Sequence, residues 1–363
     1  MSTPTPRVRM AVAAGHRVRS VIAEREPERQ IARALQDLAD ALPTAESLAV
    51  HGSRIDAVAT TPDFHPGKPV PVGVVVDAAG AVMPHLVGND IGCGMRMSVL
   101  HGLAGEDLTT PVLEAHLRHV FFRGGRDIAL RGRDRHAILR EGVPGLLESV
   151  GDERRGLLAK LDLAEAWREV DRMSDAGAFA SSEIDPDFSG YCTMEDAFRH
   201  DAILGTIGGG NHFVEIGVVD TVADGGFARV AGVRPGSVVL VVHSGSLDFG
   251  QRVGTVAREK MKRAAAGADS RIVPVGHPLY SRYLNGHANA ANAAFVNRFM
   301  IGLAAVEALS RATGRDVSQS LVYDAPHNTV WEKDGAVRHR KGACPAEGPG
   351  GLQALHLIAA KVD

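Results

Sequence analysis

The sequence contains little cysteine, few aromatic residues and no large excess of either charge. Its three cysteines, Cys93, Cys192 and Cys344, are odd in number and far apart, which argues against a disulfide framework and indicates a reducing compartment. Aromatic residues make up 5% of the chain, too few for extensive base-stacking platforms. Because 40 basic residues face 43 acidic ones, any nucleic-acid site must be a local patch.

Targeting and membrane-spanning segments are also absent from the pattern. The N-terminal stretch "MSTPTPRVRMAVAAGHRVRS" has no apolar core typical of a secretory signal. No apolar run reaches the roughly 18 residues that a membrane span needs. The sequence therefore predicts a cytoplasmic protein that does not insert into a membrane.

The hydrophobic pattern changes along the chain without a low-complexity linker or an internal repeat. Apolar residues recur at helical spacing in 31–42, whereas 46–100 is rich in β-branched residues broken by Gly and Pro. Helical patterns return in 105–175. Because the two patterns mix, we predict an α+β fold: one large domain, 46–345, with mixed or antiparallel sheets flanked by helices. A polar, helical extension (1–45) precedes it and an atypical tail (346–363) follows.

One stretch, "VGNDIGCGMR" (87–96), places an acid and a thiol three residues apart among glycines. Such glycines indicate a tightly bent backbone. Asp90 and Cys93 are both residue types that bind metal ions. The plainer alternative is a small buried cysteine in a turn, with the aspartate bonded to its own backbone.

Three histidines make the metal hypothesis more specific. His212 in "GGGNHF", His243 in "VVHSGS" and His327 in "DAPHNT" each stand where a predicted strand meets a loop. Together with Asp90 and Cys93 they form a donor set suited to zinc, iron or manganese. Five ligands exceed the four of a structural zinc site, so we predict two ions sharing the thiolate. Each histidine alone is more typical of a hydrogen-bonded core or turn residue.

Other stretches are candidates for phosphate contact. The glycines of "IGGGNHF" can present backbone N–H groups to phosphate, although no Walker A lysine follows them. His65 and Lys68 lie in the Pro/Gly loop "DFHPGKPVPVG", and five arginines lie within 123–135. "RHRKG" (338–342) is a further basic cluster. Each of these is also typical of an exposed turn or a solvated basic face.

Taken together, seven segments resemble the RtcB family of RNA ligases, in the family's order over roughly residues 60–345. They are "PDFHPGKPVPVG", "LVGNDIGCGMR", "LGTIGGGNHFVEIG", "VVHSGS", "YLNGHANAANAAFVNR", "DAPHNTV" and "HRKGA". The wording of the first three favours the branch coupled to release factor H.

The resemblance implies a reaction, cofactors and ligands. Family members join RNA ends that carry a 2′,3′-cyclic phosphate or 3′-phosphate to 5′-hydroxyl ends. They use GTP and two manganese ions, and a histidine carries GMP to the RNA 3′-phosphate. By similarity, the manganese ligands are Asp90, Cys93, His212, His243 and His327, with Cys93 bridging.

The resemblance also assigns nucleotide and RNA contacts. The residues assigned to GTP are Asn211, His212, Phe213, Val214, Glu215, His327 and Asn328. The residues assigned to RNA are His65, Lys68, Arg96, Arg340 and Lys341. Whether an accessory activating protein takes part is left open.

Two departures from the family pattern affect the catalytic assignment. Leu247 stands where the family has an arginine, and no His-Gly-Ala-Gly-Arg motif with the guanylylated histidine follows "HRKGA". His356 lacks the flanking glycines, so no residue is assigned as the nucleophile. The open explanations are a truncated or frameshifted reading frame, a relative that lost guanylylation, or another histidine in its place. The alternative functions are a metal-dependent RNA-end phosphoesterase and a non-catalytic RNA-binding relative.

Overall fold

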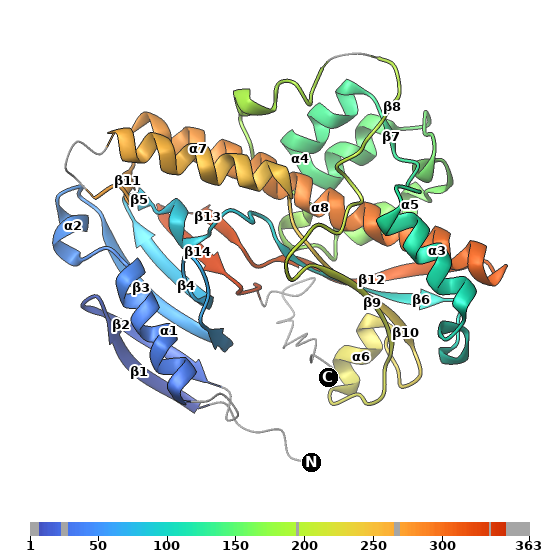
Figure 1. The fold of residues 1–363 in the computed structure, drawn as a ribbon, viewed down its shortest axis with the longest axis horizontal. Helices are drawn as coiled ribbons and strands as arrows, with labels where there is room; N and C mark the ends of the chain where they lie inside the picture. The colour runs from blue at the N-terminus through green and yellow to red at the C-terminus, as the bar shows by residue number, and fades with distance from the viewer. Residues whose placement is uncertain (1–6, 23–27, 194–195, 265–268, 334, 346–363) are drawn as a thin grey trace. The chain divides into compact units, whose positions relative to one another are not determined.

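The computed structural model describes residues 7–22, 28–193, 196–264, 269–333 and 335–345 (Figure 1). Backbone contacts divide the chain into two compact units of discontinuous segments. Unit 1 comprises 1–93, 248–290 and 327–344, and unit 2 comprises 94–247, 291–326 and 345–363. Each unit combines helices with sheets, which confirms the predicted α+β class. The predicted tail, 346–363, lies outside the described residues.

Unit 1 contains a six-stranded sheet in the order β1-β2-β3-β4-β14-β13. Its strands are β1 (Arg7–Ala13), β2 (His16–Ile22), β3 (Arg54–His65), β4 (Val72–Ala79), β14 (Ala336–Lys341) and β13 (Thr329–Lys333). Among the described strands of this sheet, only the β2–β3 pair is parallel. Short strands β5 (Ala81–Val82) and β11 (Val273–Pro274) pair separately.

One face of this sheet is covered by α1 (Glu28–Ala41), which confirms the helix predicted for 31–42. Ile31, Ala34 and Leu38 are buried with Val18 and Val58 of the sheet. The hairpin formed by β1 and β2 was not predicted, and it adds two strands of the sheet to the segment that also carries α1. The remaining helical elements of unit 1 are α2 (Ala45–Ala49), η1 (Pro84–Leu86) and α7 (Asp248–Ala264).

Unit 2 contains an antiparallel four-stranded sheet in the order β12-β6-β10-β9. Its strands are β6 (Gly94–His101), β9 (Phe213–Val218), β10 (Val238–Ser244) and β12 (Ser318–Pro326). A second, two-stranded sheet pairs β7 (Ala129–Leu130) with β8 (Arg199–His200). The buried strand predicted within 236–246 and the loop followed by a strand in 203–217 are confirmed.

The helices of unit 2 include those predicted for 105–175. The α-helices are α3 (Pro111–Phe122), α4 (Gly132–Val150), α5 (Leu163–Val170) and α6 (Gly225–Ala231). The 3-10 helices are η2 (Gly105–Leu108), η3 (Leu157–Lys160), η4 (Ser174–Gly177) and η5 (Pro186–Phe188). Helix α8 (Pro278–Thr313) belongs to unit 1 up to Ala290 and to unit 2 beyond it, where it packs on the four-stranded sheet.

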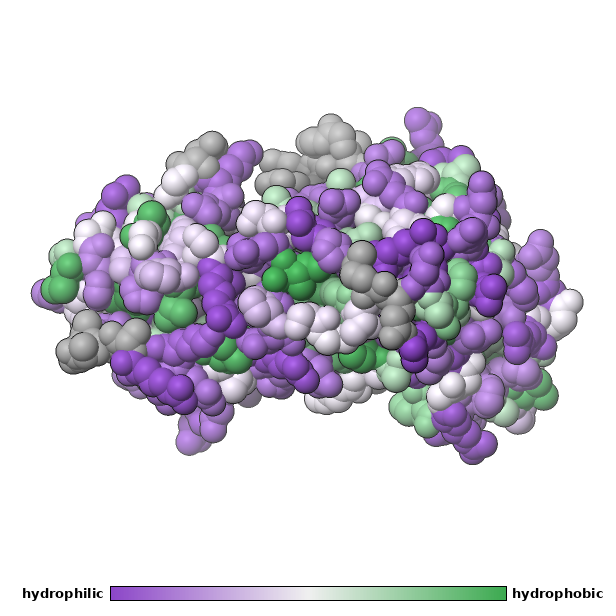
Figure 2. All heavy atoms as spheres, turned by 90° about the horizontal axis from the view of Figure 1, so that it is seen from above, coloured by the Kyte–Doolittle hydropathy of each residue, from purple (hydrophilic) through white to green (hydrophobic). Residues whose placement is uncertain are grey.

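Helix α8 is long and apolar enough to cross a membrane by length and composition. The sequence showed no uninterrupted apolar run there because asparagines divide it. In the structure, 78% of its most apolar 18-residue stretch is buried, so the apolar residues of α8 form part of the protein core. Figure 2 shows one face of the molecule, on which hydrophilic side chains dominate and hydrophobic ones form small patches.

Four buried charges connect α8 to the sheet of unit 2. Asp324, in β12, is completely buried, and its carboxylate accepts a hydrogen bond from Arg298 of α8 (2.8 Å). Its second oxygen lies 3.5 Å from the guanidinium of Arg96, which also donates to the buried Glu169 (2.5 Å). Two cations and two anions thus compensate one another, as buried charges must.

Replacing Asp324 tests this compensation. Asp324→Asn leaves two buried guanidinium groups facing one carboxylate, and should lower the free energy of unfolding by about 3 kcal/mol or more. The matched control is Asp77→Asn, which breaks the bidentate pair with the half-exposed Arg338 and should cost less than about 1 kcal/mol. Urea denaturation in EDTA measures both. Equal losses would contradict the role given to the buried group.

Two buried histidines, His287 and His339, and one partly buried histidine, His85, lie in unit 1. Burial lowers the pKa of His85 and of His339 to about 4 and that of His287 to about 3. His339 accepts a hydrogen bond from the Met83 amide (2.9 Å), and His287 accepts one from the Val330 amide (2.9 Å). A ring that accepts through one nitrogen must be neutral there, so protonation would break both bonds.

These low pKa values predict acid sensitivity. These pKa values lie below 6.5, the value in the unfolded chain. The free energy of unfolding therefore has its full value above pH 6.5, where the histidines are neutral in both states, and it decreases as the pH falls toward 4. At pH 5 the expected loss is about 2 kcal/mol for each histidine. Denaturation curves at pH 7.5 and 5 measure the loss. His339→Gln should flatten the pH dependence, whereas His101→Gln, at an exposed position, should not. An equal slope in both variants would refute the assignment.

Candidate metal centre

In unit 2, β10 supplies His243 as its penultimate residue, between Met95 of β6 and Phe213 of β9. The side chain is buried, and its Nδ1 lies 3.0 Å from the carbonyl oxygen of Asn211. Since a carbonyl only accepts, Nδ1 carries the proton and Nε2 carries the lone pair. This tautomer is the one in which a metal-ligating histidine is usually held.

The glycine-rich loop places His212 beside His243. The two imidazole rings are 5.4 Å apart in an edge-to-face arrangement. Gly208 has a φ of +92°, and a Cβ there would lie 2.7 Å from Nδ1 of His212 and 2.7 Å from the Leu247 side chain. The loop therefore needs glycine at this position to let His212 and Leu247 approach so closely.

In unit 1, the turn 90–93 is tied to the segment that follows β12. The His327 amide donates to the Cys93 carbonyl (2.7 Å), and the Gly92 amide donates to the Asn328 carbonyl (2.8 Å). The Asn328 side chain donates to the Asp90 carbonyl (3.1 Å) and accepts from the Gly342 amide (2.9 Å). Asn328 therefore organises this turn with both ends of its amide, and its predicted contact with GTP stays a prediction.

The peptide that leaves this turn enters the sheet of unit 2. Gly94 opens β6 and pairs with Ser244 of β10 and Pro326 of β12. A Cβ on Gly94 would lie 2.3 Å from the Ala325 carbonyl oxygen, so only glycine fits. Cys93 and His327 are each one peptide bond beyond this rung, and His243 is one residue from it. The sheet register thus brings the three residues to the same strand ends.

The ligand atoms of Cys93, His243 and His327 lie within 4.8 Å of one another, and so do those of Asp90, Cys93 and His212. All five predicted metal ligands therefore fall into two groups that share the buried thiol. Thiolate, imidazole and carboxylate donors fit a borderline divalent ion. The arrangement fits two ions with a common sulfur ligand; that the groups hold metal stays a prediction.

The predicted RNA contacts fall into different environments. Burial lowers the pKa of Lys341, opposed by the nearby Asp90 and Cys93, so this cation lies beside the ligand group. The guanidinium of Arg340 lies over the Trp331 ring at 4.9 Å. Lys68 is exposed, and His65 Nδ1 donates to the Asp63 carbonyl (2.7 Å).

The prediction for Arg96 conflicts with its burial. Its side chain is 1% exposed and is engaged by Glu169 and Asp324. A guanidinium in that position stabilises the protein core and is not open to RNA. Of the predicted GTP contacts on β9, Val214 packs with an apolar cluster, while Phe213 and Glu215 are exposed; none of these contacts is tested.

Sequence reasoning missed two residues of α8 that support the site. The Asn297 amide donates to the Thr206 and Gly245 carbonyls (3.0 Å each), and Arg298 donates to the Ser244 carbonyl (3.1 Å). Both side chains fix the turn directly after His243. Asparagine is uncommon inside helices, so the repeated asparagines of "NGHANAANAAFVNR" were the available clue.

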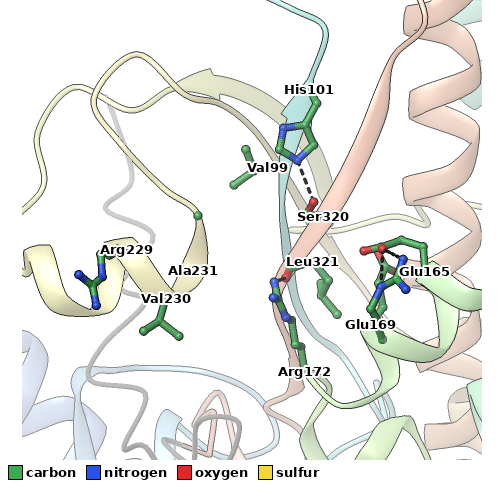
Figure 3. Close-up of a pocket in the computed structure, with 12 residues that line it drawn as sticks. Val99, His101, Glu165, Glu169, Arg172, Arg229, Val230, Ala231, Ser320 and Leu321 are labelled. Atoms are coloured by element: carbon green, nitrogen blue, oxygen red, sulfur yellow. Dashed lines mark hydrogen bonds and ion pairs between the residues drawn. The ribbon is translucent and has the colours of Figure 1, made fainter.

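A cavity of about 310 Å³ lies elsewhere in unit 2. Figure 3 shows Arg229 and Val230 of α6 on one side of it, and Arg172 with Glu165 and Glu169 on the other. Glu169 is paired with Arg96, and Arg172 donates to the Leu321 carbonyl (2.6 Å). Its described lining includes none of the predicted site residues.

Comparison with known proteins gives one consistent result. A family model described as tRNA-splicing ligase RtcB matches residues 45–359. The tRNA-splicing ligase RtcB of Pyrobaculum aerophilum is 31% identical over 320 residues, covering 80% of this chain and 62% of that protein. The corresponding protein of Methanococcus maripaludis is 28% identical over 311 residues, with the same coverage. The RNA-splicing ligase RtcB of Mycobacterium tuberculosis is 32% identical over 306 residues, 78% of this chain and 66% of that protein.

The chain thus spans about 62% of the length of the first two relatives. The matched region contains every residue of the two ligand groups, from Asp90 to His327. Assignment to the release-factor-H branch stays a prediction. On the extent of the family match and the identity to these relatives, the chain belongs to the RtcB family.

Proposed function

We propose that this chain acts as an RNA ligase of the RtcB type. It binds two manganese ions through Asp90, Cys93, His212, His243 and His327, and it binds GTP through segment 211–215 with His327 and Asn328. Its substrates are RNA ends with a 3′-phosphate or 2′,3′-cyclic phosphate and ends with a 5′-hydroxyl. The observation that supports the proposal is the pair of ligand groups sharing Cys93, within the matched region.

The residues present suit that chemistry. Two bound divalent ions would polarise phosphoryl oxygens and offset the charge that develops on them. The protein's own part is to hold the ligands: Asn211 fixes the His243 tautomer, and the backbone bonds between 90–93 and 327–328 fix the turn that carries the thiol. The partly buried Lys341 adds a positive charge beside Asp90 and Cys93.

No residue of the described segments is assigned to the covalent GMP step. Three cysteines without disulfides support a cytoplasmic location. An accessory activator is compatible with the proposal but is not part of it. The alternative function is a phosphoesterase that uses the same ions to open cyclic phosphates without GTP.

Removing the shared thiol tests the metal centre. Cys93→Ala takes one ligand from both groups, so we expect manganese content after dialysis to fall from about two ions per chain to near zero. Cys192→Ala is the matched control, because Cys192 is also a buried free thiol but belongs to neither group. Elemental analysis measures the metal. Unchanged content in Cys93→Ala would disprove the ligand assignment.

The reaction is tested by supplying the full chain with manganese and two RNA fragments, one ending in a 2′,3′-cyclic phosphate and one starting with a 5′-hydroxyl. Joined RNA that requires GTP and is lost in His243→Ala is the expected result. Cyclic-phosphate opening that is indifferent to GTP, without joining, would favour the phosphoesterase. Labelled GTP followed by a denaturing gel shows whether a covalent GMP adduct forms. If the protein is fully loaded with metal and yet shows no joined RNA and no GMP adduct, the ligase proposal is wrong.

A further inference from the structure

The six-stranded sheet of unit 1 has one face covered by α1 and a second face with a distinct pattern of side chains. Residues alternate between the two faces along each strand. Val18 of β2, Val58 of β3, Val76 of β4 and His339 of β14 are buried on the α1 side. Their sequence neighbours therefore lie on the other side, which we call the open face.

Two rows of side chains cross the open face from strand to strand. The Arg19 row is set by the pairing Met10–Arg19–Ala59–Val75–Arg340–Thr329. The neighbouring Arg17 row contains Val12, Arg17, Ala57, Asp77, Arg338 and Trp331, where the parallel Val18–Val58 pairing places Arg17 beside Ala57. Ala59 and Val75 lie between the arginines of the first row, and Ala57 and Asp77 lie between those of the second. We call the central residues Ala57, Ala59 and Val75 the floor, and the arginines of β2 and of β14 the two basic margins.

The charge on these rows is mainly positive. Four arginines face a single carboxylate, Asp77, which is bound bidentately by Arg338. Arg17 and Arg19 are exposed, and no side-chain hydrogen bond or ion pair joins either of them to another residue in the described part of the chain. A solvated guanidinium without a carboxylate partner is a ready contact for phosphate.

The dimensions and position of the rows suit a polynucleotide strand. Three strand spacings separate β2 from β14, about 14 Å in total, so the margins are far enough apart for a chain to lie between them. The Arg19 row ends at Thr329, a buried residue two positions after His327 of the ligand group, so the accessible part of the row stops at Arg340. At the opposite end, Met10 and Val12 are 66% and 70% exposed and offer apolar contact to bases.

We propose that the open face of this sheet binds the single-stranded part of the RNA substrate through its phosphates. The inference rests on the proposed function for the identity of the polyanion. Contacts to phosphate carry no base preference, so binding through this face is insensitive to sequence and sensitive to salt.

The test measures binding separately from catalysis. A labelled oligouridylate is titrated with the full, EDTA-treated chain over a range of salt concentrations, and anisotropy gives the binding constant. Arg17→Ala combined with Arg19→Ala should make the slope of log Kobs against log salt shallower by about 1.4, or about 0.7 for each lost phosphate contact. The matched control, Arg29→Ala with Arg33→Ala, removes the same charge from exposed positions on α1, over the opposite face, and should keep the wild-type slope.

A second variant addresses the floor without changing charge. Ala59→Phe places a bulky, strand-compatible side chain between the margins and should weaken binding with little change in slope. It also keeps the test decisive if the double arginine variant does not fold. Equal slopes in both arginine pairs, or unaltered binding by Ala59→Phe, would overturn the inference. The binding assay uses EDTA-treated protein and does not depend on metal. A failed ligase assay therefore does not change the binding result, and a failed binding assay does not decide whether the chain is a ligase.

Discussion

The candidate site depends on one rung of the four-stranded sheet, where Gly94 lies between Ser244 and Pro326. The backbone of β12 approaches Gly94 so closely that any side chain there would overlap the Ala325 carbonyl. This approach brings the residues just beyond the rung, Cys93 and His327, near His243 of the central strand. The ligand geometry is therefore a consequence of strand register, which is more rigid than a loop.

Helix α8 supports the rung from one side through polar and charged side chains that are buried. Asn297 and Arg298 hydrogen-bond to the carbonyls at the end of β10, and Asp324 neutralises Arg298 from β12. Apolar residues could fill the same volume, but they could not saturate the carbonyls of a strand that stops inside the protein. A buried charge network thus gives the turn after His243 one defined position, and this ties the site to the stability of unit 2.

The parts of the molecule that sequence predicted are those carried by local pattern. The helix at 31–42, the strand that carries His243 and the turn at 90–93 with its acid and thiol all follow from residue spacing. The hairpin 7–22 was missed because its alternating arginines made the segment look merely polar. Arg96 was assigned to RNA because nothing local reveals a partner such as Glu169, 73 residues away. Long-range pairing decides whether a basic residue is a ligand contact or a core residue, and it has no local signature.

Strand β14 illustrates how alternation divides one basic motif into two functions. Arg340 and Lys341 are adjacent, and in sequence they look like a single phosphate clamp. In a strand they must point to opposite faces. Lys341 shares the face of the buried His339 and lies near Asp90 and Cys93, whereas Arg340 belongs to the open face with Trp331. The two cations therefore lie on opposite faces of the strand: Lys341 lies beside the predicted metal ligands, and Arg340 borders the face that we propose to bind RNA.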